Sequence, residues 1–219
     1  NLWARPLLPV DETRYLTVAW EAHERQDFLV SHLNGETYAH KPPVLFWLIN
    51  IVWSLTGVST LAGRMVAPAA GLLCLMLNFR LARRLCPDRP AVRQAAPLMQ
   101  ASCMLWMFFS PVTMFDTLLT ASAMLALDGV LAAAQQRCLK NWIQVGVGLG
   151  LGILCKGPVV LVFVLPTMLA APWWSQMVVG SVLRWYGGVL MSVVVAACIS
   201  LAWAIPSAIG KGTPWWWTP

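Results

Sequence analysis

Apolar and polar residues separate along this chain into whole segments. After residue 43 the sequence is a series of apolar runs joined by short polar or basic connections. Most runs approach the roughly 20 residues that a helix needs to cross the hydrocarbon core of a bilayer. We place them at residues 44–60, 62–82, 95–114, 117–135, 142–155, 158–174 and 185–206. The pattern predicts an all-α bundle of transmembrane helices over residues 61–219, and we expect it to be incomplete at both ends.

The first 43 residues are polar and predict a loop outside the membrane that contains one amphipathic helix. The apolar positions within residues 12–24 recur at helical spacing and share one face: Tyr15, Val18, Ala19 and Ala22. Asp11 stands where the N-cap of such a helix is expected. Glu21 and Arg25 are four residues apart and predict an ion pair on the opposite, polar face.

Two short motifs divide this polar segment further. Asn34-Gly35 is typical of a tight turn. Lys41-Pro42-Pro43 ends any preceding helix and starts a new segment, because proline lacks a backbone N–H and restricts the residue before it. The run at 44–60 that follows is amphipathic and contains Trp47 and Trp53, so it is a candidate for a helix lying in the membrane interface.

Basic residues predict which side of the membrane each connection faces. One connection holds a dense group and a second holds a pair: Arg80, Arg83, Arg84, Arg89 and Arg93, then Arg137 and Lys140. Both are expected in the cytoplasm by the positive-inside rule, and the two runs between them return the chain to the same side. Contact with anionic lipids is the second interpretation of the arginine group. Asp116 and Lys156 then lie on the outer side. The polar segment joins them if 44–60 is interfacial, which we prefer, and is cytoplasmic if 44–60 spans.

Composition narrows the class of protein. Of the 219 residues, 58% are apolar and 11% are charged, which is too few charges to cover a water-soluble fold of this size. The net charge of +6 is therefore better explained by membrane topology than by nucleic-acid binding. The six cysteines lie in or beside apolar segments, and no Cys-x-x-Cys or Cys/His spacing indicates a structural zinc site.

A set of ionisable residues on the predicted outer side could carry chemistry. It combines carboxylates able to act as a base with cations able to hold phosphate: Asp11, Glu12, Arg14, His40, Lys41, Asp116 and Lys156. Simpler roles stay open for several of them. Asp11 and Asp116 could serve only as helix caps, and Lys41 could be an interface lysine. Asp128 lies in the middle of an apolar run, where a hydrogen bond between helices is expected.

Several motifs together resemble a known family. They are Asp11-Glu12-Thr13-Arg14-Tyr15, then Tyr38-Ala39-His40-Lys41-Pro42-Pro43, Arg64, Arg83-Arg84, Phe115-Asp116-Thr117 and Lys156-Gly157-Pro158. Their order over residues 8–206 is similar to that of GT-C fold membrane glycosyltransferases of the protein O-mannosyltransferase-like superfamily. The most similar branch is that of the lipid A aminoarabinose transferases and their bacterial relatives.

The resemblance implies a function and a role for each motif residue. Such enzymes move a sugar from a polyprenyl-phosphate carrier to a lipid or protein acceptor at the outer, periplasmic face of the bacterial inner membrane. Asp11 matches the candidate catalytic base, and Asp116 matches an acidic position of the second outer loop. Lys41 matches a lysine that meets the carrier phosphate, and Lys156 a further lysine near the cavity. Arg14 and Glu12 flank the first site.

One departure and one alternative accompany this resemblance. The aminoarabinose branch usually carries glutamate before the Lys-Pro-Pro lysine, in a position linked to a metal, whereas this chain has His40. Histidine also binds zinc, so a divalent metal at His40 is an open question. A transporter or flippase of lipid-linked sugars is the alternative function, although such proteins typically show internal repeats and none is present at a fixed period.

Overall fold

The computed structural model of the chain describes residues 6–8, 10–136, 138–174 and 181–211. Within these residues helices dominate, as the hydropathy pattern predicts. The elements in chain order are α1 (Asp11–Arg25), β1 (His32–Leu33), β2 (Glu36–Thr37), α2 (Val44–Thr56), α3 (Thr60–Arg64), α4 (Val66–Leu85), α5 (Pro90–Ser102), α6 (Met104–Phe109), α7 (Phe115–Gln135), α8 (Leu139–Lys156), α9 (Val159–Trp174) and α10 (Val182–Lys211).

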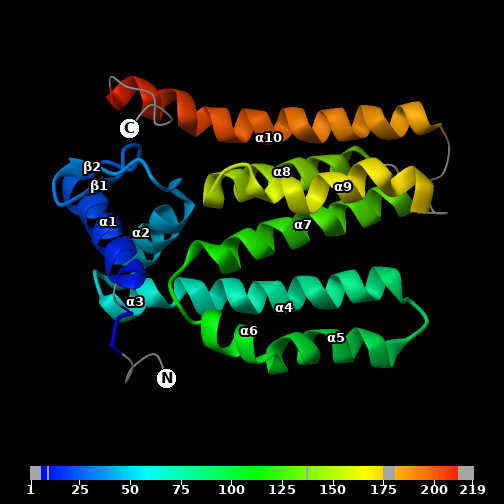
Figure 1. Ribbon diagram of the computed structural model, residues 1–219, viewed down its shortest axis with the longest axis horizontal. Coiled ribbons are helices and arrows are strands. Elements are labelled where there is room, and N and C mark those ends of the chain that lie inside the picture. The colour runs from blue at the N-terminus through cyan, green and yellow to red at the C-terminus, as the bar shows by residue number, and fades with distance from the viewer. Residues whose placement is uncertain (1–5, 9, 137, 175–180, 212–219) are drawn as a thin grey trace.

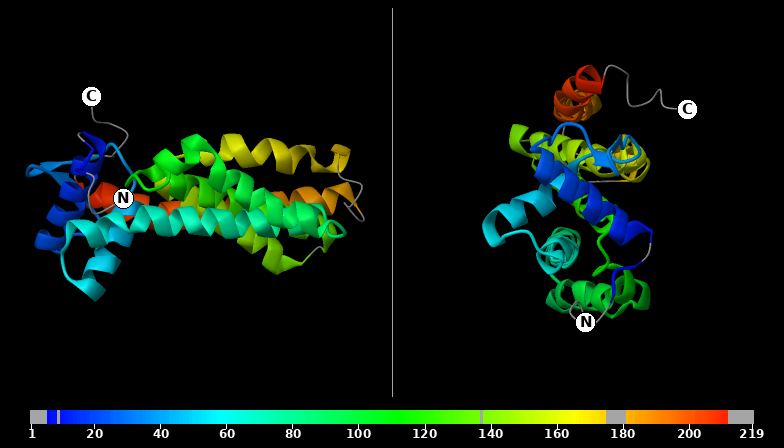
Figure 2. Two further views of the ribbon diagram at one scale, coloured as in Figure 1. Left: turned by 90° about the horizontal axis from the view of Figure 1, so that it is seen from below. Right: turned by 90° about the vertical axis from the view of Figure 1, so that its left-hand side faces the viewer.

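The long helices form an elongated bundle, and the N-terminal elements gather at one of its ends. Helices α4, α5, α7, α8, α9 and α10 run side by side along the long axis (Figure 1). Within the bundle α7 packs against α4 and α8, and α8 packs against α10. Elements α1, β1, β2, α2 and α3, residues 11–64, form what we call the head. Figure 2 shows α1 and α2 lying across the end of the bundle, which is the arrangement expected if α2 is interfacial.

Three helical stretches in the described part of the chain have the length and hydropathy to cross a membrane. They are Thr60–Leu85, Phe115–Gln135 and Val182–Ile209. Two shorter apolar helices, Val44–Thr56 and Val159–Trp173, accompany them. The all-α membrane bundle predicted from the sequence is therefore confirmed, whereas the division of the chain at residues 43 and 60 stays a prediction.

Helix α1 confirms the predicted apolar face but corrects its start. Tyr15, Val18, Ala19 and Ala22 are buried against the rest of the head and α7. The N-cap position belongs to Val10, and Asp11 is the first helical residue without a capping hydrogen bond. The prediction of Asp11 as N-cap was wrong. The carboxylate of Glu12 reaches back instead and accepts the N–H of Leu8 at 3.0 Å.

The predicted turn at Asn34-Gly35 is confirmed, and it explains why the Glu21–Arg25 ion pair does not lie where the sequence predicted. Both residues have positive φ, 55° and 86°, and they join the antiparallel strands β1 and β2. Such a two-residue turn requires positive φ at both central positions, which asparagine and glycine tolerate best. Glu21 accepts both turn N–H groups, at 2.5 and 3.1 Å. It is therefore buried, and its 3.8 Å ion pair with Arg25 lies at the edge of the hairpin rather than on a fully solvated face.

The apolar run at 95–114 is the largest correction to the predicted helices. It forms two helices, α5 and α6, because the backbone is extended at Cys103. Beyond this break α6 lies beside the start of α4 (Figure 1). The Trp106 side chain there packs on the small buried cluster around Cys74 and Leu77, and Gly71 leaves room for it. The sequence of this run contains no local signal for such a contact.

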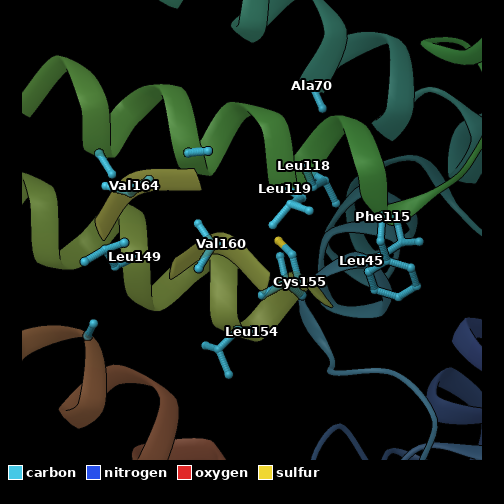
Figure 3. Packing of buried hydrophobic residues seen from close by; sticks show 14 of the residues in the cluster. Leu45, Ala70, Phe115, Leu118, Leu119, Leu149, Leu154, Cys155, Val160 and Val164 are labelled. Atoms are coloured by element: carbon cyan, nitrogen blue, oxygen red, sulfur yellow. The ribbon is translucent and has the colours of Figure 1, made fainter. Parts of the chain in front are cut away.

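Close packing of the glycine-rich helix α8 is confirmed. A Cβ added at Gly146 would lie 2.6 Å from Cβ of Val195, and one at Gly148 would lie 2.7 Å from the backbone nitrogen of Ala126. The glycines therefore bring α8 into direct backbone contact with α7 and α10. Figure 3 shows the resulting core, in which side chains of α7, α8 and α9 pack together and meet Leu45 of the head. The side chains from these three helices are Phe115, Leu118, Leu119, Leu149, Leu154, Cys155, Val160 and Val164.

Candidate functional site

The outer-side residues of α7 and α8 meet at the head end of the bundle. Lys156 Nζ lies 2.5 Å from Asp116 Oδ1, across the interface between the start of α7 and the end of α8. Helix α7 begins at Phe115 with Met114 at the N-cap and no side-chain cap. Asp116 therefore does not cap the helix, and that alternative was wrong. Its carboxylate is 56% exposed, so the pair stands at the surface of the site.

Two lysines that are far apart in the sequence line one cavity of about 330 Å³. Lys41, at the end of the loop before α2, forms one wall with His40 and Pro42. Lys156 forms another with Gly157 and Pro158, and Leu201, Trp203 and Ala204 of α10 close the side. The walls are otherwise largely apolar. A mostly apolar cavity bordered by two lysines suits an anionic head attached to an apolar chain.

Asp11 lies at the same end of the bundle, and Tyr15 connects it to the start of α7. The Tyr15 hydroxyl donates to Asp11 Oδ1 at 3.4 Å, and the Tyr15 ring meets Phe115, the residue before Asp116, edge-on with centroids 5.0 Å apart. From Tyr15, contacts between successive rings at 6.3, 6.5 and 5.4 Å lead through Phe46 and Tyr38 to His40 in the cavity wall. Asp11 and Asp116 thus lie at the same end of the bundle, although neither is among the residues that line the two-lysine cavity, and their sharing one aqueous compartment stays a prediction.

The environment of Tyr15 keeps its hydroxyl protonated. Burial, followed by the nearby Asp11 carboxylate, raises the pKa of Tyr15 from 10.0 to about 12. Arg14, on the same helix, has a smaller opposing effect on this pKa. Tyr15 therefore remains a hydrogen-bond donor to Asp11 well into the alkaline range.

Glu12 occupies a different environment from the other candidate residues. It is fully buried, and its Oε1 accepts the backbone N–H and the hydroxyl of Thr113, both at 3.2 Å. Arg64 Nε lies 3.5 Å from the same oxygen. These contacts join α1 to α3 and to the loop that leads into Asp116. In this structure Glu12 lies away from the two-lysine cavity, and its position favours a role in holding the loops over a direct contact with substrate.

The structure does not assemble a metal site around His40 from the residues it describes. The His40 side chain is exposed and contacts the Tyr38 ring. No group of three or more His, Cys, Asp or Glu side chains in the described ranges is placed to hold a metal ion. Arg14 is half-buried on α1, beside Tyr15. We derive no catalytic step through a metal.

A second cavity of about 620 Å³ lies on the other side of Asp116. Asp116, Thr117 and Thr120 of α7 line one side, and aromatic and apolar residues of α6 and its flanks line the other: Leu105, Trp106, Phe109 and Met114. Asp116 lines this second cavity and pairs with Lys156, which lines the first, so their ion pair links the two cavities.

The Arg-rich connection at the far end of the bundle has a structural partner that the sequence did not indicate. Asp128 is fully buried in α7 and is held by Arg80 at 2.7 Å, Arg84 at 2.6 Å and Gln144 at 2.9 Å. The predicted hydrogen bond of Asp128 between helices is confirmed. The interpretation of the arginines as mainly a topology signal is incomplete, because two of them neutralise this carboxylate.

Sequence reasoning missed the residues that support the site. Tyr15, Arg64 and Thr113 were not among the candidate site residues, although two of them belong to the motifs quoted above. Arg64 offered a signal, since it is a charged residue at the start of an apolar run and is 5% exposed in the structure. Thr113 offered none, because its importance depends on a contact 101 residues away in the chain.

The fold and the site together define the class of this protein: it is a polytopic membrane protein with a charged site at one end of its helix bundle. Residues 40–205 match the model of the family described as dolichyl-phosphate-mannose-protein mannosyltransferase, and the chain belongs to this family. The resemblance inferred from the sequence motifs is thereby confirmed.

Curated relatives point to one branch of this superfamily. The chain is 30% identical over 201 residues to undecaprenyl phosphate-alpha-4-amino-4-deoxy-L-arabinose arabinosyl transferase 1 of Pseudomonas fluorescens strain Pf0-1, covering 89% of this chain and 34% of the relative. It is 27% identical over 218 residues to the corresponding transferase 2 of Proteus mirabilis, covering 98% of this chain and 38% of the relative. The chain thus spans about a third of the length of these relatives.

Solved structures show the same fold. The crystal structures of ArnT from Cupriavidus metallidurans, in the apo state and bound to undecaprenyl phosphate, each superpose with a TM-score of 0.77 at 22% sequence identity. Each match covers 95% of this chain, and it covers 39% of the apo chain and 38% of the chain bound to undecaprenyl phosphate. The predicted GT-C membrane fold is confirmed.

Proposed function

We propose that this chain is the part of a membrane glycosyltransferase that holds a polyprenyl-phosphate-linked sugar and carries the catalytic base. One observation carries the proposal: Lys41 and Lys156 converge on a single, largely apolar cavity at the end of the bundle where Asp11 and Asp116 also lie. The curated relatives are named as transferases of 4-amino-4-deoxy-L-arabinose from undecaprenyl phosphate, which matches a donor with an anionic head and an apolar tail.

The two lysines stabilise the leaving group in the proposed reaction. As the bond between the anomeric carbon and the phosphate oxygen breaks, negative charge grows on the polyprenyl phosphate. Ammonium groups already placed in an apolar cavity stabilise that charge more strongly than water does. The Asp116 carboxylate fixes Lys156 at the cavity rim, so its ammonium is positioned before the donor arrives.

Asp11 completes the proposed reaction as the base. It accepts the proton of the acceptor hydroxyl while that oxygen forms the new bond to the anomeric carbon. The Tyr15 hydroxyl holds the carboxylate in place throughout. A single in-line displacement inverts the anomeric carbon. We propose that the acceptor is a lipid or glycan and that the site faces the periplasm, where the Arg-rich end of the bundle would face the cytoplasm.

The base role is tested by Asp11→Asn in the full-length protein. Glu24→Gln is the matched control, because Glu24 is an exposed carboxylate on the same helix. We expect Asp11→Asn to reduce turnover from a polyprenyl-phosphate sugar in detergent by at least about 100-fold, the scale of general-base contributions. Glu24→Gln should retain wild-type turnover. Full activity of Asp11→Asn would exclude Asp11 as the base.

The phosphate-binding role is tested separately with Lys41→Gln and Lys156→Gln. Both should weaken binding of polyprenyl phosphate itself, measured without any acceptor. Arg25→Gln, an exposed cation in the head, is the control. A transporter would also bind the carrier, but it would form no glycosylated product in detergent, so the turnover assay separates the two functions.

A further inference from the structure

The end of the bundle opposite the candidate site carries a concentrated positive charge. Arg83, Arg89 and Lys140 are exposed at this end, and Arg93 is half-buried beside them. Figure 1 places the connections from α4 to α5 and from α7 to α8 together there. The described acidic residues nearby are Asp88, which is exposed, and Asp128, which is buried. The surface therefore has a strong excess of cations.

Two further arginines at this end are held in fixed positions by α7. Arg80 and Arg84 each donate to a different oxygen of Asp128, while Arg84 also donates to Gln135 Oε1 at 3.3 Å. The Arg80 side chain is nonetheless 47% exposed. One buried carboxylate thus orients two guanidinium groups, and the three side chains together keep a net charge of +1. A signal that only sets membrane sidedness needs positive charge but no fixed orientation.

An exposed apolar stripe on α4 leads directly to these cations. Leu72, Met76 and Phe79 are 59%, 64% and 38% exposed, and they are spaced four and three residues apart on one helix face. Arg83 follows four residues later on the same face, and Arg80 lies beside it. The stripe is long enough to run beside an acyl chain, and the arginines stand where that chain would meet its headgroup.

A neighbouring helix contributes one more cation to the same face. Gln144 of α8 donates to Asp128 Oδ2 at 2.9 Å, and Lys140 precedes it by one helical turn. Lys140 therefore projects from α8 on the side that faces Asp128 and the two arginines. Cations from α4 and α8 therefore flank the Asp128 carboxylate of α7.

We propose that this face is a binding site for an anionic phospholipid of the surrounding membrane, with the headgroup phosphate on Arg80, Arg83 and Lys140 and an acyl chain along Leu72, Met76 and Phe79. The site is separate from the sugar-transfer site and stands independently of the proposed function. Basic pockets between membrane helices suit such headgroups, since each basic residue at the membrane surface adds to the attraction.

The test measures phosphatidylglycerol binding to the full-length protein by native mass spectrometry from phosphatidylcholine nanodiscs. The main variant is Arg83→Gln with Lys140→Gln, because neither residue pairs with Asp128 and the buried network stays intact. The matched control is Arg14→Gln with Arg25→Gln, which removes two cations from α1 in the head, at the other end of the bundle. We expect roughly 25-fold weaker binding in the main variant, since each lost cation contributes about 1 kcal/mol and tenfold corresponds to about 1.4 kcal/mol.

Each outcome of this test is decisive. Loss of phosphatidylglycerol in the main variant with retention in the control supports the site. Equal loss in both variants would show that only net charge matters and would overturn it, as would a wild-type protein with no preference for phosphatidylglycerol over phosphatidylcholine. Displacement of the lipid by millimolar sn-glycerol 3-phosphate would assign the site to a soluble phosphate and would equally overturn the proposal.

Discussion

At the scale of single residues, burial and charge decide which ionisable groups are structural and which are available for chemistry. Glu12 and Asp128 are fully buried and are saturated by hydrogen bonds and arginines. Asp116 and Lys156 pair at the surface of a cavity and remain partly exposed. A carboxylate thus holds the helices together where it is buried, as at Glu12 and Asp128, and remains accessible to a substrate where it is exposed, as at Asp116.

Asp128→Asn tests the structural role. Removing this charge weakens the hydrogen bonds that Arg80, Arg84 and Gln144 donate to it, and a hydrogen bond to a charged group contributes about 1.5–3 kcal/mol. We expect a clear fall in the thermal unfolding temperature in detergent. Asp88→Asn, at an exposed position in the loop after α4, should leave that temperature unchanged. A variant as stable as the wild type would show that the network contributes no net stability.

Tyr15 makes a pH-dependent contribution whose sign follows from its pKa. The pKa is about 12 in the folded protein against 10.0 ordinarily, so the folded state retains the proton over a range in which the unfolded state loses it. The contribution is complete below about pH 10 and is lost as the pH rises towards 12. We expect stability to fall over this interval, and Tyr15→Phe to fall less steeply. Tyr186→Phe is the control, and an equal slope in all three proteins would contradict the assignment.

At the scale of elements, glycine determines how closely the helices approach. A Cβ at Gly148 would meet the Ala126 backbone at 2.7 and 2.9 Å, and a backbone atom in a packed helix cannot move aside cheaply. Gly187 in α10 has nothing within 4 Å of such a Cβ. The two positions are therefore a natural pair for separating packing from helix propensity.

We expect Gly148→Ala to destabilise the protein by about 1–3 kcal/mol through overpacking. Gly187→Ala should be neutral or stabilising by up to about 1 kcal/mol, because alanine is the better helix former. Thermal unfolding in detergent compares them directly. If both substitutions had the same effect, the close contact of α7 and α8 would not be the reason for the glycine at residue 148.

At the scale of the whole molecule, the fold separates an acidic and basic site at one end from an arginine-rich end at the other. The head lies across the end of the bundle where Asp116 and Lys156 meet, and the connection from α4 to α5 lies at the far end of the long axis (Figure 1). Arg83 is in the last turn of α4 and Arg89 is in that connection. This separation is what the positive-inside pattern predicts for a protein that spans the membrane.

Cysteine accessibility tests this separation in the full-length protein. Asp27→Cys and Arg89→Cys, each in a background without the native cysteines, should react with a membrane-impermeant maleimide from opposite sides of intact inner membranes. Asp27 lies in the head and Arg89 in the loop after α4. Labelling of both from one side would place the head and the arginine-rich end in the same compartment and remove the basis for the proposed site.

The amino-acid sequence alone determined the features that depend on local chemistry. The lengths of the apolar runs indicated a helix bundle, Asn34-Gly35 indicated a two-residue turn, and the paired prolines marked the start of α2. The uneven distribution of arginine and lysine placed Asp116 and Lys156 together, and the structure brings them to 2.5 Å. The helix and turn predictions succeeded because helix length and turn conformation are set by residues close together in the chain, whereas membrane sidedness stays a prediction.

Only the tertiary structure decided the features that depend on contacts between distant residues. The break at Cys103 arises where Trp106 packs on α4, and Glu12 is buried because Thr113 lies 101 residues away. Arg80 and Arg84 are partners of Asp128 for the same reason. Lys41 and Lys156 share a cavity because α8 ends where the loop before α2 crosses the bundle. No local pattern encodes such contacts, since they exist only after the helices have packed.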